Sequence, residues 1–250
     1  MQLNKYDLNW CVRRLPYSLR STLKKYGAQI VVAGGYIRAC ILNEPINDID
    51  LFVADKDFAK QVALDMVQRD EKRLIITDNA ITVKGMKYPV QFITRWVYDS
   101  PDKILGSFDF TICQAAFWWE NFRGTVTDGA GTRSGKWMST VSDSFYQDLS
   151  AKRLIYTNPI REEEPGGSML RVLKYYQRGY RITIDSFAAV ITRLAAGVDF
   201  KAKDMVSYDG VLNAPYFHKI IRGLLHEVDP NIDPDHIIED AHAEEDDETP

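Results

Sequence analysis

Two carboxylates, Asp48 and Asp50, alternate with Ile49 and Leu51 in a stretch that otherwise has the composition of a buried strand. Because side chains alternate between the two faces of a strand, both carboxylates project from the same side. Two unpaired carboxylates so close together repel each other, and one would have to take up a proton. A divalent cation removes this conflict, and Mg²⁺ binds proteins through one or two carboxylates together with substrate phosphates. The pair therefore predicts a Mg²⁺ site, with Mn²⁺ as the alternative ion.

A glycine pair precedes these carboxylates in the segment "VVAGGYIRACILN" (residues 31–43). Gly34 and Gly35 lie between an expected strand and an expected helix, where backbone N–H groups can approach a phosphate closely. Arg38, one helical turn later, can add a charge-assisted contact to the same phosphates. A phosphate site beside a metal site is what two-metal phosphoryl or nucleotidyl transfer requires. The segment has neither the third glycine of a dinucleotide-binding fingerprint nor the Gly-Lys-Ser/Thr of a P-loop. A structural alternative stays open, in which Asp48 is a turn residue and Asp50 pairs with Arg38.

The elements that would position these residues alternate between helix and strand. Hydrophobic periodicity and turn residues predict helices over 16–27, 36–43, 55–70 and 100–108. They predict strands over 28–33, 49–54, 73–78, 80–85, 88–95, 114–119 and 124–129. From about Gly167 to about His226 the pattern is helical. An α/β first part of about 150 residues is therefore expected to precede a helical second part.

The charge is distributed unevenly along the 250 residues. The formal net charge is −4, but the chain from Glu227 onward holds 11 of the 35 acidic residues and no Lys or Arg. The preceding 226 residues carry 31 bases against 24 acids, a net charge of +7. Such a body suits a polyanionic partner. Five of its bases, which solvated helix faces could also explain, lie close to the N-terminus: Arg13, Arg14, Arg20, Lys24 and Lys25.

Composition predicts a globular protein of the reducing cytoplasm. The hydrophobic fraction is 45% and the charged fraction 26%, which are ordinary values for a globular chain. The three cysteines are widely spaced, which favours neither a disulfide framework nor a zinc site. No apolar run approaches the roughly 20 residues of a membrane span, so no membrane association is expected. The oligomeric state is not predicted.

Four segments, in order, resemble the class II tRNA nucleotidyltransferase and bacterial poly(A) polymerase superfamily. The first has the Gly-Gly-x-hydrophobic-Arg pattern, two aliphatic residues and Asp-x-Asp, and it is the most specific of the four. The others are "FDFTICQAAF" (108–117), "QDLSAKRLIY" (147–156), which is similar to an Asp-Leu strand, and "SMLRVLKYYQRGYRI" (168–182). The resemblance covers roughly residues 28–185. It implies an α+β fold: a polymerase-β-like nucleotidyltransferase head with a mixed sheet, then a helical neck domain.

The resemblance also implies roles for single residues. Asp48 and Asp50 would be the catalytic metal ligands, and Gly34, Gly35 and Arg38 would hold the triphosphate. Asp109 would sit beside the sugar or base and belong to the catalytic and nucleotide-binding set. On the neck helix, Arg171 and Lys174 would line the nucleotide pocket. The head is expected over 1–160 and the neck over 161–228, and the acidic composition of 229–250 predicts a disordered tail.

The expected reaction is transfer of a nucleoside monophosphate from an NTP to an RNA 3′ end, with tRNA or a tRNA-like end as acceptor. Several departures from the superfamily pattern keep other readings open. Ala39, Phe108 and Gln91 stand where an aspartate, an arginine and a third carboxylate are usual, and Gly167 and Ser168 replace two polar residues of the base-pairing motif. One alternative is a toxin-like or regulatory nucleotidyltransferase that modifies a protein or small molecule. The other is an inactive head that binds RNA.

Overall fold

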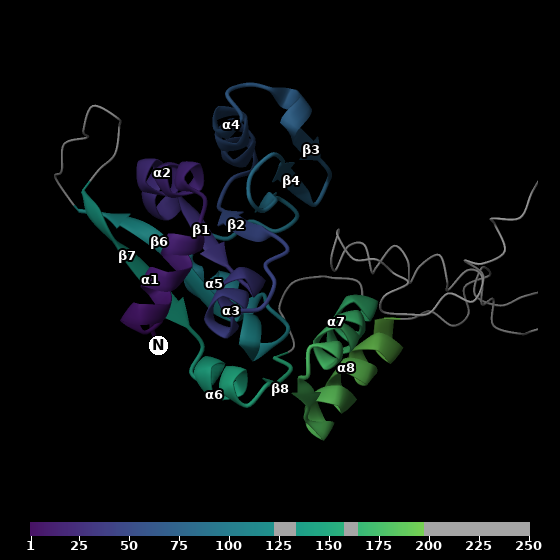
Figure 1. Cartoon of the computed structure of the whole chain (residues 1–250). Coiled ribbons are helices and arrows are strands. Elements are labelled where there is room, and N and C mark those ends of the chain that lie inside the picture. The colour runs from purple at the N-terminus through teal and green to yellow at the C-terminus, as the bar shows by residue number, and fades with distance from the viewer. Residues whose placement is uncertain (123–133, 158–164, 198–250) are drawn as a thin grey trace, which may run out of the picture. The chain divides into compact units, whose positions relative to one another are not determined.

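A computed structural model describes residues 1–122, 134–157 and 165–197. The chain divides into two compact units (Figure 1), one holding Met1–Ala151 and the other holding the described residues from Lys152 onward. The first unit is an α+β head with a mixed sheet, as expected, and the second contains a pair of helices. The predicted neck boundary at residue 228 and the predicted tail lie outside the described residues.

The head is built on one seven-stranded sheet with the strand order β3-β4-β5-β2-β1-β6-β7. Its strands are β1 (Ile30–Ala33), β2 (Ile49–Val53), β3 (Leu74–Ile76), β4 (Ala80–Val83), β5 (Val90–Ile93), β6 (Ala115–Asn121) and β7 (Gly135–Val141). Only β2 and β5 run parallel, and the other neighbours pair antiparallel. Figure 1 shows β3 and β4 at one end and β6 and β7 at the other. The strands β1 and β2 therefore lie inside the sheet.

The helices of the head are α1 (Lys5–Arg14), α2 (Tyr17–Tyr26), α3 (Gly35–Leu42), α4 (Lys56–Met66), α5 (Pro101–Gly106) and α6 (Phe145–Ser150). Short 3₁₀ turns lie at Gly27–Gln29, Glu71–Arg73 and Thr111–Cys113. The predicted helix signals are confirmed at several ends. Gly27 ends α2 at φ 64°, and the Asp55 side chain caps α4 by accepting from the Phe58 N–H at 2.6 Å. Pro101 is the first residue of α5.

The helix α1 was not predicted from the sequence. Its apolar side chains recur at helical spacing, with Cys11 and Val12 buried, and the Asn4 side chain caps it by accepting from the Asp7 N–H. The other positions of the helix hold charged and polar residues and two exposed rings, which mask the periodicity. Ahead of α1, the chain continues the sheet edge, because the backbones of Met1 and Val141 exchange hydrogen bonds of 3.0 and 2.9 Å.

Two other predictions are corrected. The expected Asp-Leu strand over 147–156 is wrong in its first half, which lies in α6; only Arg153–Leu154 form a strand, β8. Phe145 and Leu149 are four residues apart and both buried. Residues at this spacing share one side of a helix, so a helix buries both side chains in the core. The strand that follows β6 along the chain and pairs with it is β7, whereas the strand predicted over 124–129 lies outside the described residues.

The second unit contains α7 (Pro165–Gln177) and α8 (Ile184–Gly197). The two-residue strand β9 (Arg181–Ile182) interrupts the predicted helical run and pairs parallel with β8. Tyr175 and Tyr180 are buried in this unit, with ring centroids 5.6 Å apart. The rest of the predicted helical run, up to His226, lies outside the described residues.

Candidate nucleotide and metal site

The turn between β1 and α3 requires glycine at its first position. Gly34 has φ 83° and ψ −141°, a conformation that L side chains rarely adopt. A Cβ atom at Gly34 would lie 3.0 Å from Cε1 and Cζ of the Phe108 ring. The Gly34 N–H donates to the Ala115 carbonyl at 3.0 Å, which fixes the turn against β6. The helix α3 begins at Gly35, so its N-terminal amides and dipole favour an anion at this turn.

The two carboxylates lie on the neighbouring strand. Asp50 is the second residue of β2 and Asp48 immediately precedes that strand; both are half-buried and flank the fully buried Ile49. Because Asp48 lies just outside β2, the placement of both carboxylates on one side stays a prediction. The Asp50 Oδ2 atom lies 3.9 Å from the position of a Cβ at Gly34. The fold thus brings a carboxylate of the predicted metal pair next to the predicted phosphate turn.

The position for a third carboxylate is occupied by an amide. Gln91 on β5 is the register partner of Asp50, across the single parallel pairing of the sheet. Among the residues that the structure describes, no group of three or more His, Cys, Asp or Glu side chains is arranged to hold a metal ion. Two carboxylates completed by substrate phosphates still match the oxygen ligands that Mg²⁺ prefers.

Arg38 lies beneath the glycine turn rather than on the surface. Its side chain is 4% exposed, its Nε donates to the Glu44 carboxylate at 3.2 Å, and its Nη1 lies 3.5 Å from the Cys113 Sγ. Both terminal nitrogens lie within 3.8 Å of a Cβ position at Gly35. Arg38 therefore ties α3 to the Thr111–Cys113 turn, and its predicted contact with the triphosphate stays a prediction.

Asp109 lies in the segment that connects α5 to the Thr111–Cys113 turn, and it is 2% exposed. Its neighbour Phe108 covers the Gly34 turn and packs edge-on against Phe52, with ring centroids 5.7 Å apart. Two residues after Asp109, the Thr111 hydroxyl donates to the buried Asp148 carboxylate at 2.7 Å. The second and third motifs of the sequence therefore meet, although they lie 37 residues apart.

Arg171 and Lys174 lie on α7 in the second unit, three residues apart and both half-buried. Residues at this spacing share one side of a helix. The structure thus brings Gly34, Gly35, Arg38, Asp48, Asp50 and the Asp109 segment together within the head. Arg171 and Lys174 belong to the second unit, and the structure describes them only within that unit.

Sequence reasoning missed three residues of the site. Phe108 packs on the glycine turn, Glu44 pairs with Arg38, and Asp148 accepts from Thr111. Glu44 had a detectable signal, because it is the first carboxylate after Arg38 and lies just past the end of the helix. Phe108 had been noted only as a departure from the superfamily pattern. No local pattern indicates that it touches Gly34.

The Gly34→Ala substitution should destabilise the head by about 2–4 kcal/mol, from strain at positive φ and a clash with Phe108. Gly85→Ala is the matched control, since Gly85 also has a positive φ, 78°, but its close neighbour is the flexible Arg73 side chain. That control should cost only about 1 kcal/mol. Urea unfolding followed by circular dichroism measures both. Equal losses would contradict a packed ring at Gly34.

Solved structures of similar fold include enzymes named as tRNA-processing and CCA-adding enzymes. A tRNA-processing enzyme in an apo form aligns with a TM-score of 0.51 at 17% identity, covering 73% of this chain and 48% of that one. A CCA-adding enzyme in complex with ATP aligns with a TM-score of 0.51 at 16% identity, covering 88% of this chain and 55% of that one. The chain thus spans about half the length of these enzymes. A search of proteins with curated functions finds no match.

The mixed sheet, the glycine turn and the Asp-x-Asp strand define the head fold of the class II tRNA nucleotidyltransferases. Within this class of fold, the sequence pattern of the Gabija anti-defense 2 family matches residues 2–152. The chain belongs to the Gabija anti-defense 2 family. The matched segment coincides closely with the head unit, Met1–Ala151.

Two further observations concern the protein's environment. No helix among the described residues is long and apolar enough to span a membrane. Cys11, Cys40 and Cys113 are buried with free thiols.

Proposed function

We propose that the protein is a nucleotidyltransferase, which transfers a nucleoside monophosphate from an NTP to an acceptor hydroxyl. The observation that carries this proposal is the 3.9 Å separation between the Asp50 carboxylate and the Cβ position of the Gly34 turn. A triphosphate at that turn would have its phosphates within reach of a metal held by Asp48 and Asp50. The fold of the head, shared with nucleotidyltransferases, supports the same reaction.

In this reaction the acceptor oxygen attacks the α-phosphorus, and the bond from that phosphorus to the pyrophosphate oxygen breaks. The amides of the glycine turn and the first turn of α3 would hold the β- and γ-phosphates. Asp48 and Asp50 would hold Mg²⁺ or Mn²⁺, which when bound lowers the pKa of the attacking hydroxyl and neutralises the leaving pyrophosphate. Asp109 would position the sugar or base, and Arg38 would support the turn from below.

The first candidate acceptor is an RNA 3′ end of tRNA-like form. Two features support it: the solved enzymes of the same fold are named as tRNA-processing and CCA-adding enzymes, and residues 1–226 carry a net charge of +7. The family description, Gabija anti-defense, favours a second candidate acceptor, a component of the Gabija defence itself. In that case the reaction would be the same, and its purpose would be to inactivate the defence.

Labelling separates these candidates. The protein is incubated with each α-³²P-labelled NTP, Mg²⁺, and either total RNA or purified Gabija components. We expect label in RNA of tRNA size, and no label with a variant in which Asp48 and Asp50 are both Asn. Label in a Gabija component would favour the second acceptor. If RNA is bound and nothing is labelled under any condition, the head is an inactive RNA-binding form and the proposed reaction is wrong.

Arg171 and Lys174 are proposed to contact the base, so Arg171→Ala should change which NTP is used as well as the rate. Gly167 and Ser168 replace two polar residues of the superfamily's base-pairing motif, so we expect weak selectivity among NTPs in the unmodified protein. Arg181→Ala is the control, because Arg181 is an exposed residue of β9 in the same unit. Competition between two NTPs, one labelled at a time, gives the ratio of kcat/KM values. An unchanged ratio in Arg171→Ala would place Arg171 away from the base.

A further inference from the structure

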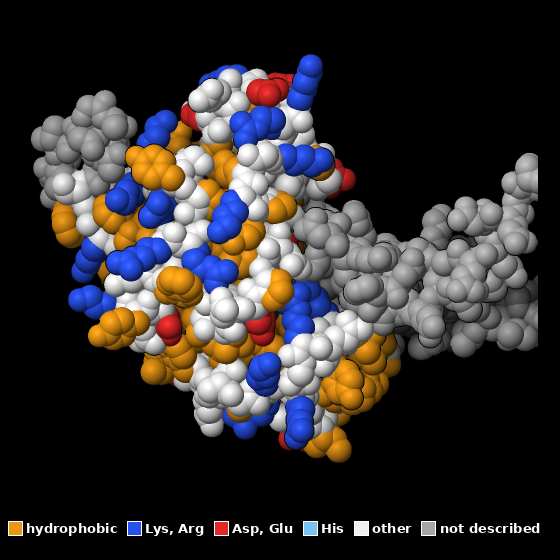
Figure 2. Space-filling view, viewed as in Figure 1, with side chains coloured by type: hydrophobic (Ala, Val, Ile, Leu, Met, Phe, Trp, Pro, Cys, Tyr) orange, Lys and Arg blue, Asp and Glu red, His pale blue; other side chains and the backbone are white. Residues whose placement is uncertain are grey.

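The helices α1 and α2 carry an exposed surface on which arginine and aromatic side chains alternate. Tyr6, Trp10 and Arg14 follow each other at four-residue spacing along α1, and Tyr17, Arg20 and Lys24 recur at spacings of three and four along α2. Residues at these spacings share one side of a helix. Figure 2 shows basic and hydrophobic side chains interleaved over these two helices. Together with Arg13, we name this set the α1–α2 surface.

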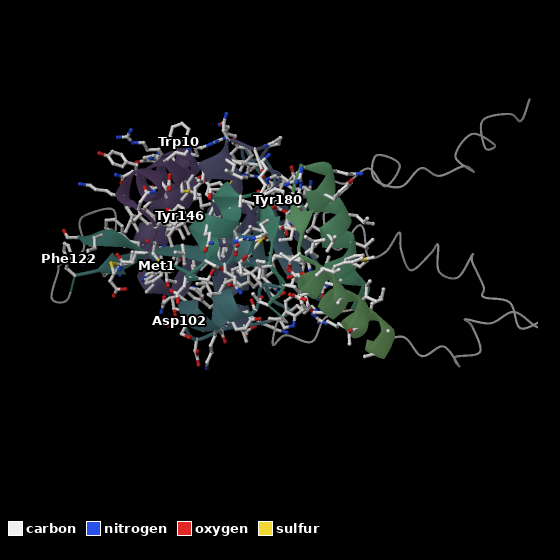
Figure 3. The ribbon with its side chains drawn as sticks, turned by 90° about the horizontal axis from the view of Figure 1, so that it is seen from below. Met1, Trp10, Asp102, Phe122, Tyr146 and Tyr180 are labelled. Carbon is white, nitrogen blue, oxygen red and sulfur yellow. The ribbon has the colours of Figure 1, made fainter. Side chains whose placement is uncertain are left out.

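The rings of this surface face the solvent. Tyr6 is 86% exposed, Tyr17 79% and Trp10 48%. Figure 3 shows Trp10 at the outer surface of the head. Tyr6 and Tyr17 bury little area in the head and are available to stack on a partner, and the half-exposed Trp10 presents part of its ring. Exposed apolar side chains that cluster among polar residues mark interaction sites, and three exposed rings occur here within twelve residues.

Three of the four cations of the surface lie beside aromatic rings. The Arg14 guanidinium lies 5.6 Å from the Trp10 ring centroid, that of Arg20 lies 5.8 Å from Tyr17, and the Lys24 Nζ lies 4.9 Å from Trp119. The Nε of Arg20 is buried and has no hydrogen-bond partner among the described residues. A guanidinium beside a ring still carries further N–H groups that can donate to phosphate oxygens.

No carboxylate occurs between Leu8 and Asn43 in the sequence. The acidic residues at the margins of these helices have partners: Asp7 accepts from the Tyr146 hydroxyl at 2.8 Å, Glu44 pairs with Arg38, and Asp65 pairs with Lys25 and Arg69. The α1–α2 surface itself thus holds four cations (Arg13, Arg14, Arg20 and Lys24) and no carboxylate, so it is positively charged. A positively charged surface attracts a polyanion, and exposed rings can stack on unpaired bases.

We infer that the α1–α2 surface binds single-stranded RNA, with its rings stacked on bases and its cations on phosphates. Stacking on aromatic rings is tolerant of sequence, and grooves of this kind cover ~4–16 nucleotides. An acidic protein would fill the cationic positions but would not need three exposed rings arranged along two helices. Double-stranded RNA keeps its bases stacked, so it cannot use the rings either.

The α1 part of this surface contacts the C-terminal end of α3, the helix whose N-terminus lies at the candidate site. The Trp10 indole N–H donates to the Cys40 carbonyl at 3.0 Å, and Arg14 Nη1 donates to Asn43 Oδ1 at 3.3 Å, both at the C-terminal end of α3. The eight residues of α3 span ~12 Å, and Gly34 precedes them. A strand bound to α1 is thus within a few nucleotides of the glycine turn. This last step, delivery of an RNA 3′ end to the site, rests on the proposed function, whereas the binding itself does not.

The test measures binding of a fluorescein-labelled single-stranded RNA of ~12 nucleotides to the full chain by anisotropy, without NTP, over a range of salt concentrations. Arg13→Gln with Arg20→Gln should weaken binding and reduce the slope of log K against log salt by about 1.4, since each phosphate contact contributes about 0.7. Tyr6→Ala, which leaves the Tyr17 ring beside Arg20 in place, should weaken binding roughly five-fold or more while leaving the slope unchanged. Hairpin duplex RNA should bind more weakly than the single strand.

Matched controls remove the same groups elsewhere. Lys56→Gln with Lys60→Gln removes two exposed charges from α4, and Tyr176→Ala removes a ring that is 71% exposed on α7. In both controls the Kd for the single strand should stay within about two-fold of that of the unmodified protein. A difference of this size corresponds to the usual effect of a surface substitution, about 0.5 kcal/mol. Melting curves of every variant identify any that fails to fold, and a single variant, Arg13→Gln, then replaces the double one.

Three results would overturn the inference. The first is binding unchanged in both surface variants. The second is equal loss in the α4 control, which would mean that only net charge matters. The third is competition by polyglutamate as effective as that by RNA of equal charge, which would assign the surface to an acidic protein. Isothermal titration of Mg²⁺ and NTP, run on the same variants, keeps the two proposals apart. If a variant binds NTP normally but no longer binds RNA, the proposed reaction is not contradicted.

Discussion

Asp48→Asn and Asp50→Asn should each reduce nucleotidyl transfer by about 10³-fold or more, because a catalytic metal contributes several kcal/mol to the transition state. Each amide keeps the shape of the carboxylate but loses the charge that holds Mg²⁺. The fold should survive, since both side chains are half-buried beside the fully buried Ile49 and do not form the core. Without Mg²⁺ the variants should melt at the same temperature as the unmodified protein or higher, because the repulsion between two carboxylates is gone.

The measurement combines transfer rates with thermal melting at increasing Mg²⁺ concentration. The melting temperature of the unmodified protein should rise with Mg²⁺, since a ligand that binds the folded state stabilises it. Neither Asn variant should show that rise. Asp102→Asn, at an exposed position of α5, is the control and should keep both properties. Wild-type turnover in either Asn variant would exclude the metal assignment.

Arg38→Ala should destabilise the head by about 3–5 kcal/mol, the usual cost of removing one partner of a buried ion pair. The side chain of Arg38 is 4% exposed and that of Glu44 14%, so the loss of the guanidinium leaves a poorly solvated carboxylate. Adding Glu44→Gln to Arg38→Ala should restore part of the stability. The coupling between the two positions should then be about 0.5–3 kcal/mol.

Urea unfolding of the four proteins of this cycle gives the coupling, and NTP titration tests the sequence-based alternative. If Arg38 contacts the triphosphate, Arg38→Ala weakens NTP binding more than NMP binding, and its stability changes little. If Arg38 is a support for the glycine turn, stability falls and both ligands are affected alike. The burial of the side chain favours the second result. A stable Arg38→Ala variant with selectively weakened NTP binding would refute it.

The sequence by itself determined the local pieces of this protein. Most predicted helices and strands of the head are present, because Pro101, Asp55 and Gly27 act on the backbone of their own segment. The strand expected over 49–54 is likewise present as β2, with Ile49 buried and Asp50 half-buried, since strand alternation is local. The spacing of the motif from Gly34 to Asp50 was specific enough to indicate the head fold of the nucleotidyltransferases.

Segments with weaker local signals were predicted incorrectly or missed. The helix α1 was missed because polar residues surround its few apolar positions, and its burial depends on packing against α3. The Asp148 segment was expected as a strand. A helix forms there instead, because it buries Phe145 and Leu149 and lets Asp148 accept a hydrogen bond from Thr111. In both cases the deciding interactions come from residues distant in the sequence, which no local pattern contains.

Only the tertiary structure decided how the pieces of the site meet. The register of β2 against β5 placed the neutral Gln91 opposite Asp50, and the packing of α5 placed the Phe108 ring over Gly34. Arg38 could equally have pointed to a ligand or into the head. Its burial follows from the position of Glu44 and Cys113, which chain folding brings to it from 6 and 75 residues away. Side-chain partners at such separations are set by the packing of the whole head, because the same backbone turn permits either direction.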